Sequence, residues 1–308
     1  MRKTLILSVA AASLVAGTLA QAAEGPLRQR LAERLAQRNK GPDGPKAPGK
    51  QTFSYGSDRL QQLDFYPAQN ARGPAPLVLF VHGGGWKRGS KDNADGSWKA
   101  PHYTASGYAY ASINYRLVPE ATVEQQGADV AAALRFLLDR AGTLGIDRTR
   151  VVIMGHSAGA HLVALVGTDE QYLKGAGLSL RDIDGVLPID GAAYDVAAQM
   201  QDGGRMMQDT YTQAFGTDPV RQAALSPTLQ AAAPNVASFL IIHVQRRDGV
   251  AQAKALQDAL RKAGTPAERR DFPGPGLTGH AEINRQLGNP DYAATPVVDD
   301  WLGRVFRR

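Results

Sequence analysis

Short apolar runs alternate with longer amphipathic segments from residue 51 to the end of the chain. The apolar runs span 61–66, 76–82, 108–114, 150–154, 184–190, 238–244 and 267–272. Apolar residues recur at helical spacing in 122–140, 250–263 and 293–306. Strands that alternate with helices of about 10–20 residues pair in parallel, with helices on both faces of the sheet. The pattern therefore predicts an α/β domain over residues 51–308.

Residues 191–235 interrupt this alternation and are rich in Ala, Gln and Met. We expect a small helical cap insertion here, over the edge of the sheet. Its large side chains either line a substrate pocket or pack as core; they are Tyr194, Met200, Met206, Met207, Tyr211 and Phe215.

The first 50 residues differ in character from the domain. Residues 1–22 have a basic start, an apolar run from Leu5 to Ala16 and a small-residue end, which is typical of a cleavable signal peptide. The run is shorter than the roughly 20 residues of a membrane span, although an uncleaved anchor is the alternative. Residues 23–50 are predicted to be a flexible basic linker. We therefore expect a periplasmic or secreted protein without a membrane span.

The net charge of +6 lies outside the predicted domain. Arg2 and Lys3 supply two of these charges and residues 24–50 supply a net four, so residues 51–308 are neutral. Nucleic-acid binding requires a basic face on the domain itself, so the sequence predicts no nucleic-acid partner. The chain contains no cysteine, which excludes disulfides, thiolate metal sites and a cysteine nucleophile.

The segment Gly155-His156-Ser157-Ala158-Gly159 carries the strongest chemical signal. It fits Gly-x-Ser-x-Gly and directly follows the apolar run 150–154. In such a motif a strand turns sharply into a helix and exposes the serine hydroxyl on a strained bend. Glycine is needed on both sides of the serine because a side chain there would collide with a neighbouring strand or helix. We predict Ser157 as a nucleophile.

A serine nucleophile needs a base, and that base needs a third group to orient it. In enzymes with this turn the chain order is serine, acid, histidine. Only His243 and His280 lie well downstream of Ser157. His243 falls within a buried strand, whereas His280 follows the glycine-rich stretch 273–279. We predict that His280 lies in a mobile loop and acts as the base, and that His156, which lies inside the serine turn, points elsewhere.

An aspartate must precede His280 and follow the end of a strand. Asp248 meets this requirement, since it comes just after the apolar run 238–244. We predict that Asp248 orients His280. Three other assignments stay open: Asp248 as the N-cap of the next helix, Asp190 as the competing acid at the end of the preceding strand, and the weaker Asp195.

A triple glycine in His82-Gly83-Gly84-Gly85-Trp86 directly follows the apolar run 76–82. It lets backbone N–H groups point into the site and stabilise an oxyanion, together with the N–H of Ala158. The alternative is a phosphate-binding loop. Its fingerprints, Gly-Lys-Ser/Thr or Gly-x-Gly-x-x-Gly at the start of a helix, are absent from this sequence.

With these motifs the chain resembles the α/β-hydrolase superfamily. The match is to the His-Gly-Gly-Gly-Trp branch, which includes hormone-sensitive-lipase-like carboxylesterases, feruloyl-type esterases and kynurenine-formamidase-like enzymes. The residues that carry it are 82–86, 114–117, 155–160, 226–227, Asp248 and His280. The resemblance implies a mostly parallel eight-stranded sheet with helices on both faces. It also implies that Gly84 and Gly85 join Ala158 in the oxyanion hole, and that no metal or organic cofactor is required.

The chain departs from this family next to the predicted acid. Arg246 and Arg247 stand where small residues usually precede the aspartate. They either keep Asp248 ionised or compete with His280 for it.

The sequence thus predicts an exported serine hydrolase that cleaves small to medium carboxylic esters through an acyl-enzyme. The partner is a small-molecule ester. An arylformamidase-like amide hydrolase is one alternative, against which the predicted export argues. A catalytically inactive hydrolase-fold binding protein is another, against which the full set of motifs argues.

Overall fold

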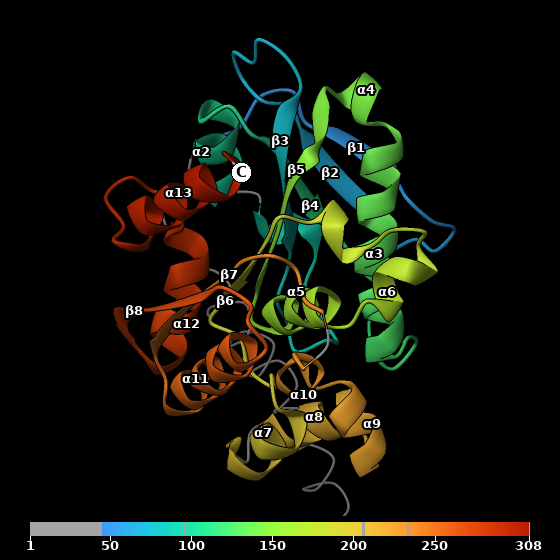
Figure 1. Ribbon diagram of the computed structural model, residues 1–308, viewed down its shortest axis with the longest axis vertical. Coiled ribbons are helices and arrows are strands. Elements are labelled where there is room, and N and C mark those ends of the chain that lie inside the picture. The colour runs from blue at the N-terminus through green and yellow to red at the C-terminus, as the bar shows by residue number, and fades with distance from the viewer. Residues whose placement is uncertain (1–44, 95–96, 205–206, 233, 308) are drawn as a thin grey trace, which may run out of the picture. The chain divides into compact units, whose positions relative to one another are not determined.

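An eight-stranded, mostly parallel β-sheet forms the centre of the domain in the computed structural model, which describes residues 45–94, 97–204, 207–232 and 234–307 (Figure 1). The strand order is β1-β2-β4-β3-β5-β6-β7-β8, and only β1 and β2 run antiparallel to their neighbours. The strands are β1 (Gln51–Ser54), β2 (Gln62–Tyr66), β3 (Ala75–Val81), β4 (Ala109–Ile113), β5 (Ile146–His156), β6 (Gly185–Ile189), β7 (Phe239–Gln245) and β8 (Ala267–Pro275). The predicted fold class is confirmed.

Helices fill most of the connections between these strands. Before the serine turn they are η1 (Lys91–Ala94), α2 (Lys99–Ala105), α3 (Val123–Asp139) and α4 (Ala141–Leu144). After it they are α5 (Ala158–Thr168), α6 (Gln171–Gly175), η2 (Leu180–Asp182), α7 (Val196–Asp202), α8 (Gln208–Phe215), α9 (Pro219–Ala224), α10 (Pro227–Gln230), α11 (Arg247–Lys262), α12 (Gly276–Gln286) and α13 (Ala294–Val305). Among the described helices, none combines the length and apolar character that crossing a bilayer requires. Residues 1–44, which include the predicted signal peptide and most of the linker, lie outside the described part.

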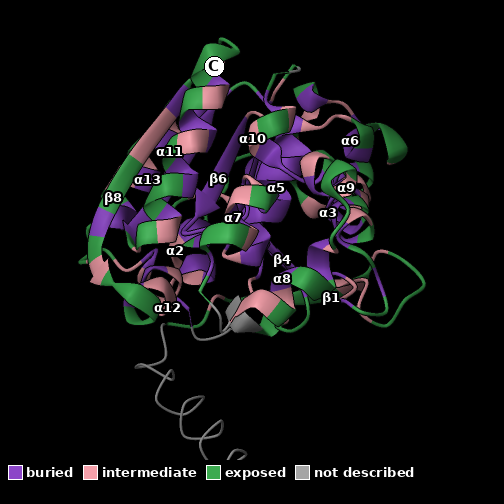
Figure 2. Cartoon of the chain, turned by 90° about the horizontal axis from the view of Figure 1, so that it is seen from below, coloured by how far each residue is buried: buried purple, intermediate pink, exposed green. Residues whose placement is uncertain are grey.

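Both faces of the sheet are covered, which explains why its central strands read as unbroken apolar runs. Side chains alternate between the two faces of a strand. In β3, Leu77 and Leu79 belong to a core with α3, α5 and α11, whereas Val78 and Phe80 belong to a second core with α2, α12 and α13. Figure 2 shows β6 in the buried colour, whereas the edge strand β8 and the outer surfaces of the helices carry exposed residues.

The region predicted as a cap, 191–235, contains α7, α8, α9 and α10, which lie together below α5 in Figure 1. A two-pronged ion pair ties α9 to α3: the Arg221 Nε and Nη2 atoms lie 2.7 and 2.9 Å from the two carboxylate oxygens of Glu124. Lys87, in the loop after β3, donates to Gln213 of α8 at 3.2 Å. These contacts hold the cap region against the body of the domain.

Helix α5 carries the serine turn into the core, and every one of its residues is buried. Its close approach to β3 requires a glycine. A Cβ at Gly159 would lie 2.2 Å from the carbonyl oxygen of Val81 and 2.6 Å from that of His82. Both atoms belong to backbone that the sheet fixes, so no small adjustment relieves the clash.

We expect Gly159→Ala to lower the free energy of unfolding by about 1–3 kcal/mol, the usual cost of overpacking a close-packed interior. Gly175→Ala is the matched control, because a Cβ at that helical glycine meets no atom within 4 Å. It should be neutral or slightly stabilising, since alanine favours helix by up to ~1 kcal/mol over glycine. Urea denaturation of both variants measures the difference, and equal stabilities would contradict the close-approach argument.

Candidate active site

The backbone bends sharply at Ser157, between the end of β5 and the start of α5. Ser157 has φ 56° and ψ −117°, a conformation that L-residues rarely adopt. Its N–H donates to the carbonyl oxygen of Ile189 at 3.0 Å, which fixes the bend to the end of β6. At Gly155 a Cβ would lie 2.2 Å from the carbonyl oxygen of Gly159. The predicted strained turn and the reason for its flanking glycines are both confirmed.

The imidazole of His280 pairs with the carboxylate of Asp190. His280 Nδ1 lies 2.5 Å from Asp190 Oδ2, and the Asp190 side chain is fully buried. Asp190 directly follows β6, and the serine turn directly follows β5. Because β5 and β6 are parallel neighbours, both residues lie at the carboxyl ends of the strands. The Asp190 Oδ1 atom accepts from the backbone N–H of Val244 at 3.1 Å.

Asp190 stays ionised despite its burial. Burial alone would raise its pKa, but the hydrogen bond from His280 and the nearby charge of Arg246 outweigh it, and the pKa is lowered overall. Because a carbonyl or carboxylate oxygen on Nδ1 leaves Nε2 free, the Nε2 atom is the one available to a reacting hydroxyl.

The expectation that Asp248 contacts His280 is not met. Asp248 lies in the first turn of α11, and its Oδ2 atom accepts from Gln199 Nε2 at 3.2 Å and from Arg246 Nη1 at 3.3 Å. The carboxylate therefore faces the cap helix α7 and an arginine. Asp190, the competing acid in the sequence, takes the position beside the imidazole.

His280 is also not in a loop. It belongs to α12, which begins at Gly276 directly after β8. The glycines and prolines of 273–279 are typical of a segment that interrupts regular structure, yet Gly276–Gly279 form the first turn of this helix. His280 is thus held on a regular element, which limits its motion.

His156, the variable residue of the serine motif, lies against His280. The two rings lie 4.4 Å apart, and His156 Nε2 donates to the backbone carbonyl of His280 at 2.9 Å. Burial and the neighbouring His280 hold the pKa of His156 well below its usual range. A neutral His156 therefore fixes the start of α12 beside the serine turn. The sequence offered no signal for this contact beyond the position inside the motif.

The glycine loop after β3 adjoins the serine. A Cβ at Gly83 would lie 2.9 Å from Ser157 Cβ. Gly84 and Gly85 have φ values of 131° and 63°, which favour glycine. Ala158 is the first residue of α5, where backbone N–H groups have no partner within the helix. The loop and the helix start thus flank the hydroxyl, and the oxyanion role of Gly84, Gly85 and Ala158 stays a prediction.

Two buried residues hold this loop in place. His82 donates from Nδ1 to the carbonyl of Gly83 at 2.7 Å and stacks on Tyr115 at 4.3 Å; burial lowers the pKa of His82 to about 4. Trp86 donates from Nε1 to His161 Nδ1 at 3.3 Å. His161 is therefore a packed histidine, and both rings are buried.

The cap covers the far side of the loop. Trp86 packs edge-on against Phe215 of α8 at 4.7 Å, and a Cβ at Gly85 would lie 3.0 Å from Thr210 of the same helix. Of the cap side chains considered above, Tyr194, Tyr211 and Phe215 are buried, whereas Met206 lies outside the described residues.

Within the described residues, no hydrogen bond joins the Ser157 hydroxyl to His280 Nε2, so the serine–histidine contact stays a prediction. Catalytic hydrogen bonds are often long in ligand-free enzymes and tighten when substrate binds. The two residues are neighbours through His156, which precedes Ser157 and contacts His280. No group of three or more potential metal ligands is gathered in the described ranges.

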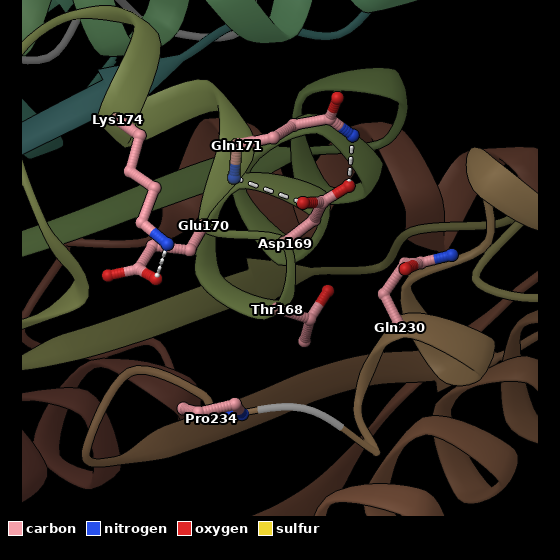
Figure 3. Close-up of a pocket in the computed structure, with 7 residues that line it drawn as sticks. All are labelled: Thr168, Asp169, Glu170, Gln171, Lys174, Gln230 and Pro234. Carbon is pink, nitrogen blue, oxygen red and sulfur yellow. Dashed lines mark hydrogen bonds and ion pairs between the residues drawn. The ribbon is translucent and has the colours of Figure 1, made fainter.

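The hollow in Figure 3 lies elsewhere on the domain. Its lining residues are Thr168, Asp169, Glu170, Gln171, Lys174, Gln230 and Pro234. Thr168 is the last residue of the eleven-residue helix α5 and Ser157 precedes the first. At a rise of 1.5 Å per residue, this places the hollow about 16 Å from the serine. It is therefore separate from the candidate active site.

Known proteins that resemble this chain include several esterases. A probable isoprenylcysteine alpha-carbonyl methylesterase of Arabidopsis thaliana is 33% identical over 128 residues, 42% of this chain and 26% of that protein. Esterase LipC of Mycobacterium tuberculosis is 34% identical over 122 residues, 38% of this chain and 30% of that protein. The aligned parts thus cover about a quarter to a third of these curated relatives.

Solved structures agree on the fold. Esterase B from Lactobacillus rhamnosis superposes with a TM-score of 0.73 at 21% identity, covering 93% of this chain and 95% of that one. A truncated carbohydrate esterase from gut microbiota gives a TM-score of 0.71 at 22% identity, covering 86% of this chain and all of the other. These likenesses establish the α/β-hydrolase fold.

The family model for BD-FAE matches residues 63–243. This range includes the glycine loop, the serine turn and Asp190, and it exceeds half of the chain. The chain therefore belongs to the BD-FAE family, within the α/β-hydrolase superfamily and its His-Gly-Gly-Gly-Trp branch.

Proposed function

We propose that the protein is a serine esterase that cleaves small to medium carboxylic esters through an acyl-enzyme. The observation that carries the proposal is the buried Asp190–His280 pair, at 2.5 Å, at the carboxyl ends of the strands, where Ser157 lies half-buried on a strained turn. Curated relatives that resemble the chain are named as esterases, which favours an ester over an amide.

In this mechanism Ser157 Oγ attacks the ester carbonyl while His280 Nε2 takes the hydroxyl proton. Asp190 holds the ring through Nδ1 and stabilises the imidazolium that forms. The N–H groups of Gly84, Gly85 and Ala158 would bind the oxyanion, each such donor contributing about 10²–10³ in rate. His280 then donates the proton to the leaving alcohol, and the same residues activate water to release the acid.

The position of the cap supports the limit on substrate size. Helix α8 lies over Gly85 and packs on Trp86, and the Arg221–Glu124 ion pair holds the cap region to α3. An ester that reaches Ser157 must fit beneath these elements or enter beside them.

Replacing the nucleophile or the base should abolish turnover. We expect Ser157→Ala and His280→Ala each to lose about 10³–10⁶ in kcat toward short-chain p-nitrophenyl esters, with the double variant no worse than either single one, because the two act as a unit. Ser54→Ala, an exposed serine of β1, is the control and should retain wild-type turnover. Activity that survives Ser157→Ala would refute the proposed function.

The two aspartates should differ sharply. Asp190→Asn removes the charge that stabilises the imidazolium, and we expect a loss of about 10³–10⁴ in kcat. Asp248→Asn leaves His280 with its carboxylate, and we expect a loss of about tenfold or less. Steady-state kinetics of both folded variants decides the assignment. A larger drop in kcat for Asp248→Asn would identify Asp248 as the catalytic acid.

We also propose that the protein is exported to the periplasm or beyond. The support is the sequence of residues 1–22, with its basic start, apolar run and small-residue end. Expression of the full chain in a bacterium with a periplasm should give a mature protein whose first residue is Ala23, by N-terminal sequencing of the osmotic-shock fraction. Recovery of the uncleaved chain in the cytoplasm alone would contradict export.

A further inference from the structure

Arg246 lies between β7 and α11 and reaches the carboxylate of the candidate catalytic pair. Its side chain is only 13% exposed, and its Nε atom lies 3.1 Å from Asp190 Oδ2. Its Nη2 atom donates to the backbone carbonyls of Asp190 at 3.4 Å and Gly191 at 3.2 Å. The guanidinium thus holds both the side chain and the backbone of the residue after β6.

Room for this arginine is built into α11. A Cβ at Gly249 would lie 3.1 Å from Arg246 Nη2 and 3.4 Å from both Arg246 Nε and Asp190 Oδ1. Any larger residue at Gly249 would press on the guanidinium and on the carboxylate together.

The same oxygen of Asp190 accepts from two donors, His280 Nδ1 and Arg246 Nε. The Oδ1 atom accepts from the backbone N–H of Val244. Three separate donors therefore fix the orientation of the carboxylate. The positive charge of Arg246 also offsets part of the negative potential that Asp190 exerts on His280. Loss of the guanidinium charge would therefore expose the imidazole ring to the full negative potential of Asp190.

Asp248 acts on the other side of Arg246. Its Oδ2 atom lies 3.3 Å from Arg246 Nη1 and 3.2 Å from Gln199 Nε2, which also donates to Tyr211 of the cap at 3.0 Å. A polar chain therefore runs from His280 through Asp190, Arg246 and Asp248 to the cap. The negative charge of Asp248 offsets part of the positive charge of Arg246.

Other titratable groups around the pair come from the neighbouring elements. His156 of β5 contacts His280 directly, and Lys99 of α2 acts electrostatically on His156. Tyr194 and Tyr292 interact electrostatically with Asp190, and Glu282 lies on α12 itself. Among these groups in the described ranges, Arg246 is the cation that contacts the Asp190 carboxylate.

We propose that Arg246 is a positioning residue for the Asp190–His280 pair, fixing the carboxylate and offsetting part of its negative potential at the imidazole ring. The inference rests on the proposed serine-hydrolase function for its catalytic meaning, although the electrostatic effect on His280 is measurable without turnover.

The test compares Arg246→Gln, Arg246→Lys and the control Arg247→Gln, which removes the same charge from the adjacent exposed arginine. The first readout is the pH titration of the His280 ring C–H resonance by NMR. The second is the pH profile of kcat/KM toward a p-nitrophenyl ester. Circular dichroism verifies that each variant is folded.

Arg246→Gln should move the His280 titration midpoint and the acidic limb of kcat/KM upward by about 0.5–1 pH unit, since a charge within ~6 Å changes ionisation by about this much or more. Loss of a positive neighbour makes the imidazolium easier to form, which fixes the upward sign. Arg246→Lys keeps the charge, so both of its curves should lie close to those of the wild type. Arg247→Gln should leave both curves in place.

A fall in activity without movement of either curve would reduce Arg246 to a structural contact and overturn the proposal, as would an equal shift in Arg247→Gln. If Arg246→Gln does not fold, Asp248→Asn supplies the opposite test. Removing that negative charge should move the midpoint downward, and an upward shift or none would overturn the proposal. If the variants shift the His280 titration as expected but the wild-type protein hydrolyses no ester, the proposed function is refuted and this inference stands.

Discussion

A buried carboxylate at the end of β6 sets the arrangement of the whole site. An ionised group removed from water costs several kcal/mol unless other groups compensate for the lost hydration. Asp190 is compensated by His280 of α12, by Arg246 after β7 and by the N–H of Val244 within β7. These donors come from separate parts of the chain, so they are satisfied together only when β6, β7 and α12 occupy their native places.

Helix α12 is fixed at its other end by a buried lysine. Lys99 of α2 is fully buried, and its ammonium binds the backbone carbonyl and the Oδ1 atom of Asn284 in the last turn of α12. A cation at the C-terminal end of a helix complements the helix dipole. Burial lowers the pKa of Lys99 to about 7. The helix that carries His280 is thus held by His156 near its start and by Lys99 near its end.

The serine side of the site depends on backbone geometry and not on charge. Ser157 keeps a strained positive φ because its N–H is bound to Ile189 and because α5 is packed against β3 through Gly159. The glycine loop after β3 is fixed by His82 and Trp86, whose rings are both buried. Rigid backbone on one side and a charge-held imidazole on the other give the preorganisation that a hydrolase needs.

The sequence by itself determined the central strands and the strained turn at Ser157. Apolar periodicity located the central strands, because a strand covered on both faces must be apolar throughout, and Gly155 and Gly159 revealed a bend that tolerates no side chain. The histidine could also be found from chain order, but its helix could not, because glycine and proline at 273–279 suggest a loop. Only the tertiary structure decided which aspartate holds His280 and what Arg246 and His156 do. Asp190 and Asp248 both follow strands and look alike in sequence; the direction of each carboxylate depends on partners far away along the chain, and such long-range contacts leave no local pattern.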